Sequence, residues 1–145
     1  MTQLSDHFTL EELVFSSTAV PLGIDNTPPP EIIENLRILA QGLEQVRSLL
    51  GHAMHIDSGY RCDILNAAVK GSRTSAHLEG YAADFICPDF GTPLEIVKLI
   101  TGSTLAFDQC IQEGTWVHCS FDPRMRREVL TAHFANGGAT YTQGA

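Results

Sequence analysis

Residues 75–84 read Ser75-Ala76-His77-Leu78-Glu79-Gly80-Tyr81-Ala82-Ala83-Asp84, a polar turn that leads into an apolar run expected to form a buried strand. His77 and Asp84 can both bind one metal ion, and His118 follows in Trp116-Val117-His118 on another expected strand. Two imidazoles and a carboxylate give Zn²⁺ three protein ligands and leave the fourth position open, as in catalytic zinc sites. Structural zinc sites are instead closed by four ligands, often Cys. The pattern therefore predicts a catalytic Zn²⁺ site at His77, Asp84 and His118.

The composition limits the class of protein. A chain of 145 residues, 43% of them hydrophobic, can bury one core, so we expect a single domain over residues 1–145. No apolar run approaches the roughly 20 residues of a membrane-spanning helix, and residues 1–6 lack the apolar segment of a signal peptide. We therefore expect synthesis in the cytoplasm without membrane insertion. The formal net charge of −8 argues against a nucleic-acid partner and is compatible with a peptide substrate.

The four cysteines do not resemble a metal site. None of them forms a Cys-x-x-Cys pair, which argues against a cysteine zinc cluster. Without a signal peptide the expected state is the free thiol, and their apolar neighbours suit small buried side chains. These residues are Cys62, Cys87, Cys110 and Cys119.

The order of expected elements predicts the fold class. Apolar residues recur at helical spacing over residues 31–50 and stop before Gly51, which predicts the longest helix. Shorter helices are expected after Thr9, over residues 63–69, and from Thr92 to about Gly102. Strands are expected over residues 53–58, 82–87, 107–113 and 116–121, whereas residues 125–141, with a turn at Gly137-Gly138, fit a strand or a helix. We therefore expect an α+β domain with a small antiparallel sheet, flanking helices and the zinc site on the sheet.

The expected hairpin at Gly114-Thr115 supplies a candidate general base. A two-residue turn there pairs Ile111 with His118 and places Glu113 on the face of His118, about 7–8 Å away. Zinc lowers the pKa of a bound water to about 7, and a carboxylate at that distance could take its proton. A register slip of one residue would put Gln112 there instead. The planar, permanently charged fork of Arg61 is the candidate for stabilising an oxyanion or binding a substrate carboxylate.

Each candidate also has an ordinary structural explanation. His118 could be a hydrogen-bonded strand residue, Arg61 and Glu113 could be solvated surface charges, and Ser75 could cap a local turn. Their joint arrangement favours a site. Four other histidines are expected not to be ligands: His7, His52, His55 and His133.

The same residues resemble a known group of zinc peptidases, the D-alanyl-D-alanine carboxypeptidases and endolysin-type peptidases, which is related to VanX-type dipeptidases and the hedgehog signalling domain. The resemblance covers Ser-Gly-Tyr-Arg at residues 58–61, the S-x-H-x-x-G-x-A-x-D pattern at residues 75–84 and Trp-x-His at residues 116–118. The wider order resembles a phage and prophage branch, in Phe8–Leu13, Asn26–Pro30 and Phe107–Gln109.

The resemblance implies a small α+β fold with the metal on the sheet and zinc bound by His77, Asp84 and His118. It also implies that Arg61 contacts the substrate or stabilises the transition state and that Ser75 supports the site; we expect Arg61, Ser75 and Trp116 to line the substrate site. One departure concerns the base. Several relatives place a glutamate where this chain has Thr115, and others place a histidine where it has Trp116. Glu113 is the nearest carboxylate, and Asp108, on the opposite side of its strand, is the alternative.

Two functions follow as hypotheses. The first is a zinc-dependent peptidase of peptidoglycan stem peptides, cutting at D-Ala-D-Ala or at L-Ala-D-Glu, and encoded by a phage or prophage. Such a protein would act on the cell wall after release or as part of a virion. The second is a non-catalytic zinc-binding module of the same fold, which the missing glutamate at residue 115 keeps open. A signalling domain without metal would require the ligand pattern to be coincidental.

Overall fold

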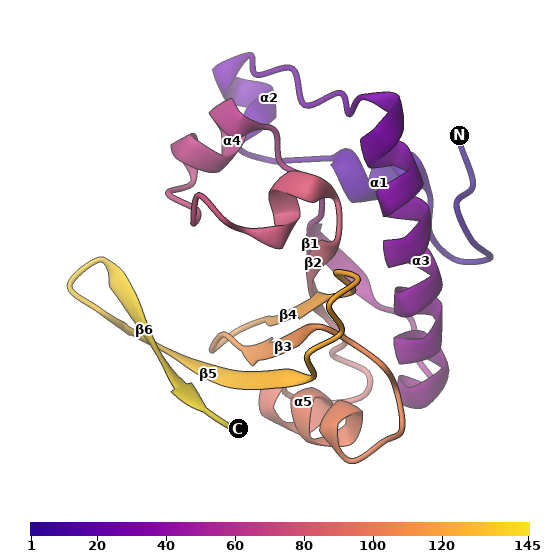
Figure 1. Cartoon of the computed structure of the whole chain (residues 1–145), viewed down its shortest axis with the longest axis vertical. Helices are drawn as coiled ribbons and strands as arrows, with labels where there is room; N and C mark the ends of the chain where they lie inside the picture. The colour runs from indigo at the N-terminus through magenta and orange to yellow at the C-terminus, as the bar shows by residue number, and fades with distance from the viewer.

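A computed structural model describes residues 1–145 as a six-stranded sheet with helices around it (Figure 1). The helices are α1 (Leu10–Val14), α2 (Ala19–Leu22), α3 (Pro30–Leu50), α4 (Asp63–Ala68) and α5 (Pro93–Thr101), with the 3₁₀ turn η1 (Ala76–Glu79). The strands are β1 (His55–Ser58), β2 (Ala82–Ile86), β3 (Gln109–Gln112), β4 (Val117–Ser120), β5 (Glu128–Ala135) and β6 (Gly138–Gln143). The expected α+β class is confirmed.

The strands lie in the order β1-β2-β4-β3-β5-β6, and every neighbouring pair is antiparallel except β3 and β5. This parallel pair is the one departure from the antiparallel sheet that we expected. Its cause is the β3–β4 hairpin, in which Ser120 at the end of β4 pairs with Gln109 at the start of β3. A short connection from there begins β5 beside the start of β3, so the two strands run in the same direction.

Helix α3 forms where its spacing predicts. Pro30 occupies the first helical position, where no backbone N–H is needed, and Gly51 ends the helix at φ 70°. Its buried face contributes Leu36, Leu39, Leu43 and Val46 to the core, among others. No helix, α3 included, combines the length and the apolar character that crossing a membrane requires.

Alternation along the central strands separates the core from the functional face. In β2, Ala83 and Phe85 belong to the core, and in β4 Val117 and Cys119 do. The residues between them point to the other face of the sheet, because successive strand residues alternate. This second face carries Asp84 and His118. As expected, all four cysteines are free, and three of them are buried.

The ambiguous tail is a hairpin of two strands, β5 and β6, that extends away from the body of the molecule (Figure 1). Its turn is Asn136-Gly137, with φ values of 52° and 77°, and Ala135 pairs with Gly138. Two positive φ angles in succession define the turn type that Asn-Gly favours in hairpins. The turn therefore lies one residue earlier than the Gly137-Gly138 that we expected.

Candidate active site

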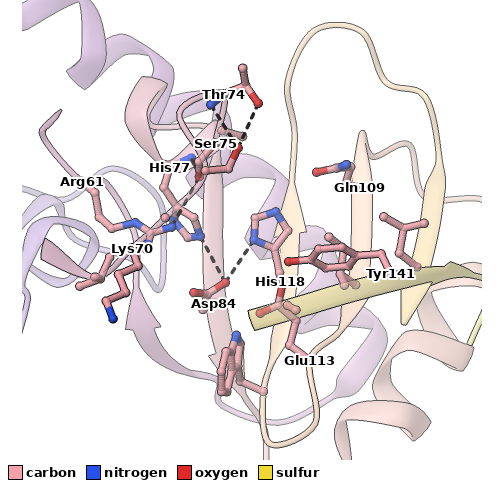
Figure 2. A pocket seen from close by; sticks show the side chains of 18 of the residues that line it. Arg61, Lys70, Thr74, Ser75, His77, Asp84, Gln109, Glu113, His118 and Tyr141 are labelled. Atoms are coloured by element: carbon pink, nitrogen blue, oxygen red, sulfur yellow. Dashed lines mark hydrogen bonds and ion pairs between the residues drawn. The ribbon is translucent and has the colours of Figure 1, made fainter. Parts of the chain in front are cut away.

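Three side chains from different elements converge on the second face of the sheet: His77 of η1, Asp84 of β2 and His118 of β4 (Figure 2). Asp84 Oδ1 lies 3.2 Å from Nε2 of His77 and 3.2 Å from Nδ1 of His118. One ligand atom of each residue lies within 4.8 Å of the other two. The structure thus brings the three predicted ligands together in an arrangement that could hold a metal ion.

The hydrogen bonds of His77 indicate which ring atom faces the cluster. His77 is buried, and its Nδ1 lies 2.7 Å from the carbonyl oxygen of Gly59. A carbonyl only accepts, so Nδ1 carries the proton. Burial lowers the pKa of His77 and favours the neutral ring, whose Nε2 then points a lone pair at the carboxylate of Asp84. Two acceptors in contact repel each other unless a cation joins them, and two imidazoles with one carboxylate suit Zn²⁺.

The carboxylate at the centre of the cluster is ionised. Burial alone would raise the pKa of Asp84, but His77 and His118 hold it well below its usual range when their rings carry a proton toward it. A cation bound in place of those protons would act in the same direction. The two rings meet edge-on, with centroids 5.0 Å apart, so packing fixes their orientations. Nε2 of His118 is buried without a hydrogen-bond partner. No group of the protein therefore hydrogen-bonds this ring nitrogen. Buried polar atoms without a protein partner are common where a ligand completes a site.

The Ser-Gly-Tyr-Arg motif carries the chain from β1 past α1 to the cluster. A Cβ atom on Gly59 would collide with the backbone carbonyl of Leu13, so only glycine lets the two segments approach this closely. The N–H of Tyr60 donates to the same Leu13 oxygen at 2.8 Å. This close approach directs the Gly59 carbonyl at His77 and so orients the ring. Such a partner fixes the tautomer of a metal-binding histidine.

Arg61 lies two residues after Gly59 and is positioned through its backbone. Its N–H donates to the carbonyl of His77 at 3.1 Å. On either side, Nδ2 of Asn26 donates to the Tyr60 carbonyl at 2.9 Å, and the N–H of Cys62 donates to Oδ1 of Asn26 at 2.8 Å. Asn26 therefore holds the segment that presents Arg61, a role that the spacing of the sequence did not indicate.

The side chain of Arg61 lies at the edge of the cluster. Its Nη2 is 3.5 Å from Oγ of Ser75, and that oxygen also accepts from the N–H of His77 at 3.2 Å. Burial lowers the pKa of Arg61, while the charges of Asp84 and Glu113 raise it again. A guanidinium nevertheless remains charged. Its Nε is buried without a partner, so the group retains a free donor.

The hairpin register places Glu113 where the sequence predicts. Ile111 pairs with His118, and the N–H of Glu113 donates to the carbonyl of Trp116 at 3.0 Å. Glu113 therefore lies on the face of His118 and lines the same cavity. Burial raises its pKa, the charge of Asp84 adds to this, and His118 and the Trp116 side chain oppose it. A half-buried carboxylate with a raised pKa beside the cluster has the properties of a general base.

The cluster opens into a cavity of about 700 Å³. Trp116, a predicted substrate contact, forms part of its wall and packs against Phe134 of β5, with ring centroids 6.0 Å apart. Several lining residues were not predicted as part of the site; they lie in the loop after α4, at the start of β3 and in the chain after β4. Among them are Lys70, Gln109, Arg124, Arg126, Leu130 and Tyr141.

The alternative base, Asp108, does not line this cavity. Its carboxylate is fully buried and accepts from Nε and Nη2 of Arg126, both at 2.9 Å. Asp108 is therefore a structural ion-pair partner. The four histidines that we expected not to bind metal are absent from the cavity wall: His7, His52, His55 and His133.

Comparison with known protein families gives one result. A sequence model of the family described as Peptidase M15 matches residues 6–120. The match runs from before α1 to the end of β4, and it includes the three residues of the cluster together with Arg61 and Glu113. The β5–β6 hairpin lies outside it. No curated protein matches the chain.

Proposed function

The chain belongs to the peptidase M15 family, and we propose that it is a zinc-dependent peptidase that hydrolyses amide bonds in the stem peptides of peptidoglycan. One observation carries this proposal. His77, Asp84 and His118 meet within 4.8 Å of one another at a cavity that also contains Glu113 and Arg61. This combination supplies three metal ligands, a base and a fixed positive charge.

The residues of the chain have separate tasks in this reaction. His77, Asp84 and His118 would hold the zinc ion, which supplies Lewis-acid polarisation and lowers the pKa of a water. A carboxylate oxygen of Glu113 takes the proton from the attacking water and delivers it to the amide nitrogen that leaves. The raised pKa of Glu113 suits both transfers, because the group must gain and then lose the proton. Arg61 stabilises negative charge on the carbonyl oxygen or holds a substrate carboxylate.

The charges around the cavity favour an anionic peptide. Arg61 and Lys70 line it without an ion-pair partner, although the whole chain has a net charge of −8. Peptidoglycan stem peptides bear carboxylates at D-Glu and at the C-terminus, which these cations would attract. As the order of motifs resembles a phage and prophage branch, we also propose that the protein acts on the bacterial cell wall, after release or within a virion.

A non-catalytic metal-binding module is the competing function. It was suggested by the absence of a glutamate at residue 115. The position of Glu113 on the cavity wall supports the enzyme instead, since it supplies a carboxylate on the same face as His118.

The test uses the peptide L-Ala-γ-D-Glu-L-Lys-D-Ala-D-Ala, which contains both candidate bonds. The zinc-loaded protein should cut it, and the masses of the products identify the bond and thus a carboxypeptidase or an endopeptidase. Glu113→Gln should keep about one zinc per chain and lose hydrolysis by at least about 100-fold. If this variant hydrolyses as fast as wild type, the assignment of the base is wrong. If the zinc-loaded wild type cuts neither bond, the proposed function is wrong.

A further inference from the structure

The register of the sheet places a tyrosine of the last strand on the face that carries the cluster. His118 in β4 pairs with Ile111 in β3, Ile111 with Leu130 in β5, and Leu130 with Gln143 in β6. Directly paired residues share a face of a sheet, and so do residues two apart in one strand. Tyr141, two residues before Gln143, therefore lies on the same face as His118.

The side chain of Tyr141 extends from β6 into the cavity of the cluster (Figure 2). Its hydroxyl points toward the side where Asp84 and His118 lie. Partial burial raises the pKa of Tyr141, and the charges of Glu113 and Asp84 raise it further, so the phenol keeps its proton at neutral pH.

The hydroxyl of Tyr141 has no hydrogen-bond partner in the protein. By contrast, the hydroxyl of Tyr81 donates to Oδ1 of Asn35 at 2.9 Å. Tyr141 is 52% exposed, so its neutral hydroxyl is open to solvent in the cavity and can donate to a ligand there. It lies beyond residue 120, where the family match ends, so the match assigns it no role.

Tyr141 and Arg61 approach the cluster from opposite edges of the sheet. Arg61 follows β1, which forms one edge, and Tyr141 belongs to β6, which forms the other. Asp84 and His118 come from β2 and β4, which lie between them. A peptide in the cavity would therefore have a cationic donor on one side and a neutral donor on the other.

We infer that Tyr141 is a catalytic residue whose hydroxyl donates a hydrogen bond to the carbonyl oxygen of the scissile amide as negative charge develops on it. The inference rests on the proposed function. The phenol keeps its proton throughout, so no bond of Tyr141 forms or breaks. A donor aimed at developing charge acts mainly in the transition state, and its loss lowers kcat more than it raises KM.

The test is Tyr141→Phe, which keeps the ring and removes only the hydroxyl. Loss of one oxyanion donor predicts a fall in kcat of about 100-fold on the pentapeptide, with KM changed by less than about threefold. Zinc content and the far-UV circular dichroism spectrum should stay those of wild type. Tyr81→Phe, which removes a hydroxyl outside the cavity, is the matched control and should keep wild-type kcat.

A binding measurement distinguishes a hydrogen-bond donor at residue 141 from a side chain that only forms part of the cavity wall. A phosphinate analogue of the bond that wild type cuts imitates the tetrahedral transition state, and its affinity should fall in Tyr141→Phe by about the same factor as kcat. The affinity for the product peptide should not change. If kcat and phosphinate affinity stay at wild-type values, or if only KM rises, the inference is overturned. A wild type that cuts no peptide overturns the proposed function and this inference with it.

Discussion

Asp84 and His118 stand directly opposite each other in the antiparallel pair of β2 and β4, and Asp84 Oδ1 lies 3.2 Å from His118 Nδ1. Both side chains therefore project from neighbouring points of one rigid sheet, and only His77 comes from a turn. Because the register fixes this distance, the two groups need little rearrangement to share a ligand. Pre-organisation of this kind reduces the entropy lost when a ligand binds.

Asp84→Asn should abolish zinc binding and leave the fold intact. The amide has the shape of the carboxylate but carries no charge, and a neutral amide oxygen is a much weaker ligand for Zn²⁺ than a carboxylate oxygen. We expect zinc to fall from about one per chain in wild type to a trace after dialysis, measured by elemental analysis, with an unchanged circular dichroism spectrum. Asp89→Asn, at an exposed carboxylate, is the control. Full zinc content in Asp84→Asn would exclude Asp84 as a ligand.

Glu113→Gln should stabilise the metal-free protein at high pH. Burial raises the pKa of Glu113, so the folded state binds its proton more tightly than the unfolded chain does. The wild type therefore loses stability as the pH rises through this raised pKa, and the glutamine variant does not. Below the ordinary glutamate pKa of about 4.3 the two proteins should be equally stable.

Urea unfolding in the presence of a chelator, at pH 4 and at pH 8, measures this difference. Glu79→Gln, at an exposed position of η1, should match wild type at both pH values. If Glu113→Gln is less stable than wild type at pH 8, the folded protein stabilises the ionised carboxylate of Glu113, and the prediction of a raised pKa is wrong.

The β3–β4 hairpin shows what local sequence can predict about the site. The turn at Gly114-Thr115 and the alternation on either side fix the register, and the register alone puts Glu113 on the face of His118. Helix α5 is similar, since Thr92 and Glu95 form the reciprocal capping pair that their spacing predicts.

The β5–β6 hairpin shows where local sequence is insufficient. Its residues fit a helix or a strand, and the parallel pairing of β5 with β3 depends on where the chain leaves β4. Consequently Phe134 and Tyr141 could not be assigned to the cavity from spacing. The Asn136-Gly137 dipeptide was the available signal, because it strongly favours the hairpin turn observed here.

Asp108→Asn should destabilise the protein, by about 2 kcal/mol at pH 7. Burial would raise the pKa of Asp108, but hydrogen bonds from the side chain and backbone of Arg126 outweigh it and hold this pKa below its usual value. The stabilisation is therefore complete above the unfolded pKa of about 3.9 and is lost as the pH falls through the lower, folded value. Urea unfolding at pH 7 and at pH 2.5 should show the variant converging on wild type in acid. An equal difference at both pH values would contradict this account.

Gly42→Ala should destabilise the protein even though it lies inside α3. Alanine normally stabilises a helix interior by about 1 kcal/mol relative to glycine. Here the face of the Phe121 ring covers Gly42, and a Cβ atom would lie 2.6 Å from three ring atoms. We expect a net loss of about 1–3 kcal/mol in the free energy of unfolding, since overpacking forces the ring or the helix to move.

The double variant Gly42→Ala with Phe121→Leu separates this clash from other effects. The smaller, flexible leucine can yield to the new methyl group, so alanine should cost less beside leucine than beside phenylalanine. Ser48→Ala, on the exposed side of the same helix, should give only the small gain of helix propensity. Thermal and urea unfolding of wild type, Gly42→Ala, Phe121→Leu and the double variant measure the coupling between residues 42 and 121. If Gly42→Ala is more stable than wild type, the Phe121 ring does not exclude a methyl group at residue 42, and the predicted clash is wrong.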